Sequence, residues 1–273
     1  EILRKIRGLA DKYGLTLLPE IHSMYGEKIH EKLAEEGYMT YDFFLPGLII
    51  DALERNSNGY LIKWITDIQE KGIRVVNMLG CHDGIPLLDL KGLIPDEQIE
   101  KLIKTVVGRG GYVKDLHGKE NVYYQVNATY YSALGEDDRK LLMARAIQIF
   151  MPGKPQVWYI DLLAGKNDHD AVKNAGPGGH KEINRTNLTT AQVRKELEKE
   201  VVRKQLEMLR FRNTFQAFGF DAELCILDSD STQLKLRWKK NGFSALLEAN
   251  LETHRFRIEG SDEEGNILFE MMQ

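Results

Sequence analysis

Four apolar runs alternate with helical stretches across the first 163 residues, and this alternation constrains the fold more than any other feature. The runs are residues 15–22, 39–45, 75–79 and 156–160. Each has the length and apolar content of a buried strand. Strands that recur between helices predict a parallel sheet with helical crossovers. Four such units form an α/β architecture that amounts to half of an eight-stranded (β/α)8 TIM barrel.

The last third of the chain has a different pattern. Residues 188–219 indicate a long helical segment, and short apolar runs separated by turn residues follow from residue 222. Such runs predict a small antiparallel β domain appended to the sheet. We therefore expect three parts. They are residues 1–165, the second half of a barrel; residues 166–220, the barrel end and a helical connection; and residues 221–273, the antiparallel β domain.

Composition disfavours several classes of protein. The 273 residues carry 37 basic and 41 acidic side chains, a formal net charge of −4. Electrostatics therefore favours neither nucleic acid nor an anionic membrane as a partner, and no apolar run is long enough to span a bilayer. The two cysteines, Cys81 and Cys225, form neither a metal-ligand spacing nor a disulfide framework. Low cysteine use favours a cytoplasmic location.

Two of the apolar runs end in the residue types that glycosidic bond chemistry uses. Glu20 and His22 close the first run, and His82 and Asp83, held between glycines, follow the third. The carboxyl ends of strands in a parallel barrel form the mouth of the active site. We therefore expect the two carboxylates to serve glycosyl transfer there. A structural glutamate and a hydrogen-bonded histidine at a strand end are the alternative interpretations of Glu20 and His82.

An ordered set of segments resembles a known family. The segments are Glu-Ile-His-Ser-Met-Tyr (20–25), Tyr-Asp-Phe-Phe-Leu-Pro (41–46), His-Asp-Gly-Ile (82–85), Tyr-Gln-Val-Asn-Ala-Thr-Tyr-Tyr-Ser-Ala-Leu-Gly (124–135), Leu-Leu-Ala-Gly-Lys-Asn-Asp (162–168) and Glu-Ile-Asn-Arg (182–185). Together they resemble sucrose phosphorylase and its relatives in the α-amylase superfamily of glycoside hydrolases. The resemblance covers nearly all of residues 1–215 and weakens in the β domain.

The resemblance implies a role for each matching residue. Glu20 would be the general acid/base, and Asp83 would bind sugar hydroxyls and stabilise the oxocarbenium-like transition state. Five further residues match substrate-binding positions of the family: His82, Tyr124, Gln125, Arg185 and His22. His22 has the alternative role of bracing Glu20. The chemistry uses an α-glucoside and inorganic phosphate, and it requires neither a metal nor an organic cofactor.

The acceptor site departs from the family pattern. Val122 stands three residues before Gln125, where sucrose phosphorylases usually have an Asp that helps to hold fructose. Tyr124 stands where relatives acting on sucrose 6′-phosphate have His. Residues 179–182 add basic side chains where relatives often have Gly-Arg-Asp, which bears on phosphate or acceptor binding. The donor glucose site therefore looks intact, whereas sucrose, sucrose 6′-phosphate and glucosylglycerol all remain candidate substrates.

One family motif has no match. The family's nucleophile is the Asp of an Arg-x-Asp motif, and no segment before Glu20 carries it. We therefore expect this chain to be the carboxyl-terminal part of a retaining disaccharide phosphorylase, with the amino-terminal half-barrel in cis or on a companion chain. The sequence also allows the protein to form a homodimer. An α-glucoside hydrolase or transglucosidase is the alternative enzyme, and a non-catalytic sugar-binding half-barrel is the alternative of another class.

Overall fold

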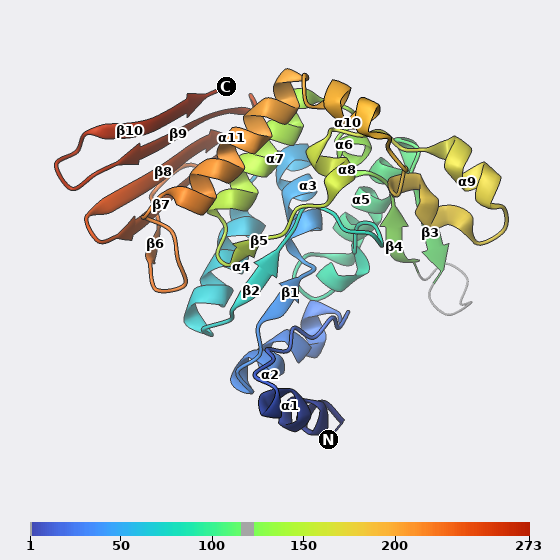
Figure 1. Ribbon diagram of the computed structural model, residues 1–273, viewed down its shortest axis with the longest axis horizontal. Helices are drawn as coiled ribbons and strands as arrows, with labels where there is room; N and C mark the ends of the chain where they lie inside the picture. Colours follow the sequence, from blue (N-terminus) through green and yellow to red (C-terminus); the bar gives the residue numbers. More distant parts are fainter. Residues whose placement is uncertain (1, 116–122) are drawn as a thin grey trace.

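The computed structural model describes residues 2–115 and 123–273, and Figure 1 shows their arrangement. A parallel sheet lies at its centre, in the order β1 (Thr40–Asp42), β2 (Val75–Asn77) and β5 (Lys154–Pro155). The registers pair Thr40 with Val75 and Val76 with Lys154. Helices α3 (Leu45–Arg55) and α4 (Gly59–Glu70) form the crossover from β1 to β2. The predicted parallel sheet with helical crossovers is confirmed, with strands shorter than expected.

Two of the four predicted strands are wrong in detail. Residues 15–22 have no regular secondary structure, because a strand needs a neighbour to complete its hydrogen-bond ladder and the described sheet begins at β1. The fourth strand comes earlier than predicted. The amide of Gln156 donates to the carbonyl of Asn77 at 2.7 Å, and the chain then enters α8 (Tyr159–Leu162). The aromatic residues that suggested a strand therefore lie at the start of a helix.

Helix α7 (Asp138–Phe150) lies at the centre of the core. The carboxylate of Asp137 accepts hydrogen bonds from the amides of Arg139 and Lys140 at the start of the helix. The spacing of apolar residues over 137–150 predicts an amphipathic helix, but every residue from 141 to 150 is buried. The helix contacts α11 (Glu200–Thr214) and also strands of the antiparallel sheet, so that even its polar residues Arg145 and Gln148 are buried.

Short elements surround this centre. Before the sheet lie α1 (Ile2–Lys12), η1 (Tyr25–Glu27) and α2 (Ile29–Glu35). After β2 come η2 (Leu88–Leu90), α5 (Asp96–Gly108), the hairpin of β3 (Tyr112–Asp115) and β4 (Tyr123–Asn127), and α6 (Tyr130–Ala133). Then follow α9 (His169–Ala175), η4 (Gly179–Asn184) and α10 (Thr190–Glu196). Strand β3 lies within residues 108–120, whose Gly and Lys content predicts a loop, and the long helix expected over residues 188–219 is two helices, α10 and α11.

The carboxyl-terminal part is a five-stranded antiparallel sheet, as predicted. Its order is β10 (Ile267–Met272), β9 (Arg255–Ser261), β8 (Phe243–Asn250), β7 (Gln233–Lys240) and β6 (Glu223–Ile226). Figure 1 shows α7 and α11 side by side next to this sheet, and α7 contacts its strands. One buried apolar cluster runs from Tyr25 to Met271, so the two sheets share a core. No helix in the described ranges is long and apolar enough to cross a membrane.

Candidate active site

The loop after β2 turns sharply and lies against β4. Ile85 and Val126 exchange backbone hydrogen bonds of 2.8 and 3.0 Å. Gly84 has a φ of +116°, and a Cβ there would lie 2.7 Å from the carbonyl oxygen of Val126. Only glycine accommodates this conformation and this approach. The second glycine of the motif therefore has a structural role, which is to fix the direction in which His82 and Asp83 leave β2.

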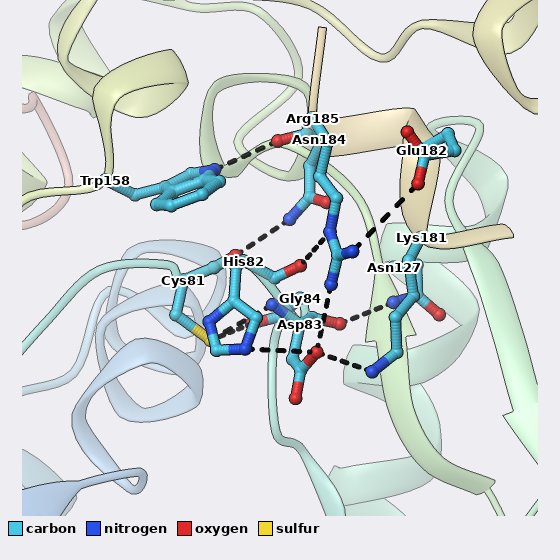
Figure 2. A network of polar contacts seen from close by, with 10 residues as sticks. All are labelled: Cys81, His82, Asp83, Gly84, Asn127, Trp158, Lys181, Glu182, Asn184 and Arg185. Carbon is cyan, nitrogen blue, oxygen red and sulfur yellow. Dashed lines mark hydrogen bonds and ion pairs between the residues drawn. The ribbon is translucent and has the colours of Figure 1, made fainter. Parts of the chain in front are cut away.

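Asp83 is the electrostatic centre of the site (Figure 2). Its Oδ1 accepts a hydrogen bond from Lys181 Nζ at 2.5 Å and another from Arg185 Nη2 at 3.3 Å. The Nε2 atom of His82 lies 3.5 Å from the same oxygen. Partial burial favours a raised pKa for Asp83, but the Lys181 hydrogen bond and the charges of His82, Lys181 and Arg185 lower it on balance. The carboxyl group is therefore held ionised.

Residues from the end of η4 fasten the backbone of this loop. The guanidinium Nε of Arg185 donates to the backbone carbonyl of His82 at 2.8 Å. The side-chain amide of Asn184 donates to the backbone carbonyl of Cys81, also at 2.8 Å. The imidazole of His82 is half exposed, and its ring centre lies 6.2 Å from that of Trp158. Arg185 and His82 thus lie together beside Asp83, as the resemblance implies, with the His82 ring open to a ligand.

Glu20 and His22 reach the same place from the irregular segment before η1. One carboxylate oxygen of Glu20, one of Asp83 and one ring nitrogen of His22 all lie within 4.8 Å of one another. Glu20 is exposed, whereas His22 is half-buried. The Nδ1 atom of His22 lies 2.9 Å from Asp89 Oδ2, and its ring stacks on Phe43 at 3.8 Å between centres. The predicted convergence of the two carboxylates is thus present, and the His22 ring is held by Asp89 and Phe43.

The acceptor residues are described only in part. Gln125 lies in β4, where its side chain is buried and its amide nitrogen has no hydrogen-bond partner among the described residues. A buried polar nitrogen of this kind needs a hydrogen-bond partner, and the described residues do not supply it. Val122 and the side chain of Tyr124 lie outside the described residues, so their predicted contribution to the acceptor site remains a prediction.

A second carboxyl group lies beneath the loop. Asp161 is buried, its Oδ1 accepts from the amide of Tyr130 at 2.8 Å, and a Cβ at Gly80 would collide with its Oδ2. Burial raises the pKa of Asp161 to about 6, against the Tyr130 hydrogen bond and the charge of Arg145. The first glycine of the motif is therefore needed because Asp161 packs against the backbone there.

The donor atoms of Glu20, His22 and Asp83 are of the kinds that bind divalent cations. However, the Lys181 ammonium at 2.5 Å from Asp83 already occupies the cationic position beside this carboxylate. A metal ion at Oδ1 of Asp83 would therefore meet the charges of Lys181 and Arg185.

Several residues of the site were missed by sequence reasoning. Asp89 and Asp161 lie outside the segments that carry the resemblance, and Asn127 lies within one of them, residues 124–135, without an assigned role. Only their contacts identify these three residues. Lys181 had a signal, since the basic run at residues 179–182 departs from the family pattern, but the sequence left its partner open.

Known proteins share this sequence and fold. No protein-family model matches the chain. A sucrose 6(F)-phosphate phosphorylase of Ilumatobacter coccineus is 52% identical over 94% of this chain and 50% of the relative. A sucrose phosphorylase of Streptococcus mutans is 34% identical over 96% of this chain and 54% of the relative. The crystal structure of the sucrose 6F-phosphate phosphorylase from Thermoanaerobacter thermosaccharolyticum has a TM-score of 0.90, at 38% identity, over 99% of this chain and 54% of that chain.

The chain spans about half the length of the curated relatives it matches. The order of its elements, a parallel half-barrel followed by an antiparallel sheet, is the order predicted from the motifs. The chain is therefore a sucrose phosphorylase-like member of the α-amylase superfamily, and it corresponds to the carboxyl-terminal half of the (β/α)8 barrel together with the small β domain that follows it.

Proposed function

We propose that the complete protein is a retaining disaccharide phosphorylase, which transfers a glucosyl unit from sucrose or a related α-glucoside to inorganic phosphate. The observation that carries this proposal is the convergence of Glu20, His22 and Asp83 within 4.8 Å. This arrangement supplies a proton donor and a fixed negative charge at one place in the barrel mouth. The names of the relatives support the same reaction.

The reaction divides into two displacements at the anomeric carbon. In the first, a nucleophilic carboxylate from the other half of the barrel bonds to this carbon, the glycosidic bond breaks, and Glu20 gives its proton to the departing oxygen. In the second, Glu20 takes the proton from the attacking phosphate oxygen, the covalent bond to the enzyme breaks, and α-glucose 1-phosphate leaves. Asp83 faces the positive charge that develops on the sugar ring in both steps.

The remaining side chains orient the sugar. His82 and Arg185 flank Asp83 and offer donors to sugar hydroxyl groups, while His22 is held in place by Asp89 and Phe43. Gln125 has a buried amide nitrogen without a partner among the described residues, and we assign it to an acceptor hydroxyl. We take sucrose 6F-phosphate as the first donor to test, because the relative at 52% identity has that name. Sucrose and glucosylglycerol are the alternatives.

An apolar surface along the first 21 residues supports completion of the barrel by another segment. Its side chains are exposed although they are large and apolar: Ile2, Ile6, Leu9, Tyr13, Leu15, Leu18 and Ile21. An apolar patch of this extent marks a surface that another segment covers. We place the nucleophile-bearing half-barrel there, in cis or on a companion chain, and this argues against a self-sufficient sugar-binding half-barrel.

The test is the release of α-glucose 1-phosphate by the complete protein. Sucrose 6F-phosphate, sucrose and glucosylglycerol are each supplied with phosphate, and glucose and glucose 1-phosphate are measured separately. Glucose 1-phosphate as the main product supports the phosphorylase. Free glucose as the main product identifies the hydrolase instead. We expect this chain alone to give neither product, because it lacks the nucleophile, and measurable phosphorolysis by the pure chain contradicts the proposed division of roles.

The cellular location and the oligomeric state of the enzyme belong to the same proposal. We place the enzyme in the cytoplasm and allow it to form a homodimer, as the sequence suggested. Cell fractionation and the mass of the native particle by light scattering test these two points.

A further inference from the structure

Two cations from one short segment meet a single oxygen of Asp83. Lys181 lies within η4, and Arg185 follows its last residue. Their terminal nitrogens lie 2.5 and 3.3 Å from Asp83 Oδ1. Figure 2 shows the other carboxylate oxygen pointing away from both, and no side chain of the described residues donates a hydrogen bond to it. One oxygen is therefore held by protein cations while the other is left for a ligand.

The two cations differ in what else they hold. Arg185 also donates to the carbonyl of His82 at 2.8 Å, and its Nη1 lies 4.0 Å from Glu182 Oε1. Within the described part of the chain, the ammonium of Lys181 pairs with Asp83 alone. Replacing Arg185 therefore disturbs the loop backbone, whereas replacing Lys181 changes only the carboxylate of Asp83.

The backbone that carries Lys181 is anchored independently of its side chain. Ile183 is buried, its carbonyl accepts from the amide of Asp168 at 2.9 Å, and Asn184 holds the carbonyl of Cys81. A substitution at Lys181 therefore leaves η4 in place, which makes the contribution of its charge separable from folding.

We propose that Lys181 is a positioning residue for the glucosyl transfer, which fixes Asp83 by its Oδ1 so that Oδ2 is presented to the sugar hydroxyls. This inference rests on the proposed function. Glu20 lies near this pair, since a carboxylate oxygen of Glu20 lies within 4.8 Å of one of Asp83. The other groups facing Asp83 are His82, Arg185 and His22. An ion pair of this geometry lowers the pKa of the carboxyl group.

The first test follows the ionisation of Asp83 in this chain, without any activity measurement. The carboxyl carbon of Asp83 is titrated by NMR in the unmodified chain, Lys181→Met and Lys181→Arg, with Asp83→Asn to assign the signal. We expect Lys181→Met to raise the midpoint by about one pH unit and Lys181→Arg to restore most of the shift. Lys204→Met is the matched control, because Lys204 also pairs with one carboxylate, that of Glu200 at 2.8 Å on α11. An unchanged midpoint in Lys181→Met overturns the proposal.

The second test uses the complete protein. In Lys181→Met we expect the acid limb of the pH profile of kcat/KM to move to higher pH, with about a tenfold loss at the acid end, and Lys181→Arg to recover it. A parallel loss at every pH, without a shift of the limb, overturns the positioning role. If the unmodified complete protein shows no phosphorolysis at all, the proposed function fails, and the NMR titration still decides whether Lys181 controls Asp83.

Discussion

The side-chain amide of Asn127 donates a hydrogen bond of 2.5 Å to the backbone carbonyl of Asp83. Asn127 ends β4, the strand that also carries Gln125. This bond joins the loop that presents Asp83 to the hairpin that presents Gln125. The residue at the proposed sugar site and the residue at the proposed acceptor site therefore keep a fixed relation to each other.

Replacing Gly84 should disrupt the contact between the loop that carries Asp83 and strand β4. A Cβ in Gly84→Ala would lie 2.7 Å from Val126 O and 3.1 Å from Asn127 Nδ2, at a φ of +116°. We expect a loss of about 1–3 kcal/mol in the free energy of unfolding, measured by urea denaturation. The matched control is Gly176→Ala, which also has a positive φ, of +72°, but has no atom within 4 Å of its Cβ. Equal losses in the two variants would show that strain alone, and not contact with β4, determines the effect.

The effect of replacing Glu20 on the reaction rate should depend on the leaving group of the glucosyl donor. In the complete protein, we expect Glu20→Gln to lower kcat/KM for sucrose-type donors by about 10²- to 10⁴-fold, because the departing oxygen is no longer protonated. The formation of the glucosyl-enzyme from α-glucosyl fluoride should fall much less, since fluoride leaves without a proton. Glu97→Gln, at an exposed position whose one ion pair among the described residues is with Lys101 on the same helix, is the control. Equal losses on both donors would assign Glu20 a role other than that of an acid.

His30 should make the chain less stable in acid. Its ring is buried against Tyr25 and Phe44, and burial lowers its pKa to about 4, against the opposing charge of Glu31. Between pH 6.5 and 4 the unfolded chain binds a proton that the folded chain does not, so His30 lowers the stability as the pH falls. The full effect is about 3 kcal/mol.

His30→Leu removes this proton. We expect the stability of the variant, relative to the unmodified chain, to rise as the pH falls from 7 to 4.5, measured by urea denaturation at each pH. A constant difference between the two proteins across this range would mean that His30 is protonated without cost in the folded state.

Asp161, in contrast to His30, should make the chain less stable as the pH rises. Burial raises its pKa to about 6, so the folded chain binds a proton that the unfolded chain releases between pH 3.8 and 6. Its contribution to stability is present below this window and is lost as the pH rises through it, by about 3 kcal/mol in total. Asp161→Asn should therefore gain stability relative to the unmodified chain from pH 4 to pH 7. The exposed Asp170→Asn variant should show no such trend, and a flat difference for Asp161→Asn would place its pKa near that of an ordinary carboxyl group.

The sequence predicted what depends on local pattern and on strand ends. Glu20, His22 and Asp83 were expected at one mouth because each was placed where a strand ends, and a helix was expected over residues 137–150 because apolar residues recur there at helical spacing. The five carboxyl-terminal strands followed from alternation and turn residues. These signals lie within a few residues of the feature that they predict.

The predictions that failed concern features that depend on contacts between residues far apart in the sequence. Residues 15–22 have the composition of a strand but no ladder partner in the described sheet. The break between α10 and α11 comes at Lys199, an ordinary helix former that takes an extended conformation here. The partner of Lys181 could not be found from the sequence, because nothing in a basic run says which carboxylate will lie opposite it after folding.

The contacts that fasten the site loop have a consequence for the order of folding. Lys181, Asn184 and Arg185 reach residues 81–83 across 98 to 103 positions of sequence. Closing so long a segment loses chain entropy before any of these bonds forms, and contacts of high sequence separation form slowly. The core around α7 can therefore assemble while the site is still open. Recovery of ligand binding, rather than of compactness, is the signal that this chain has finished folding.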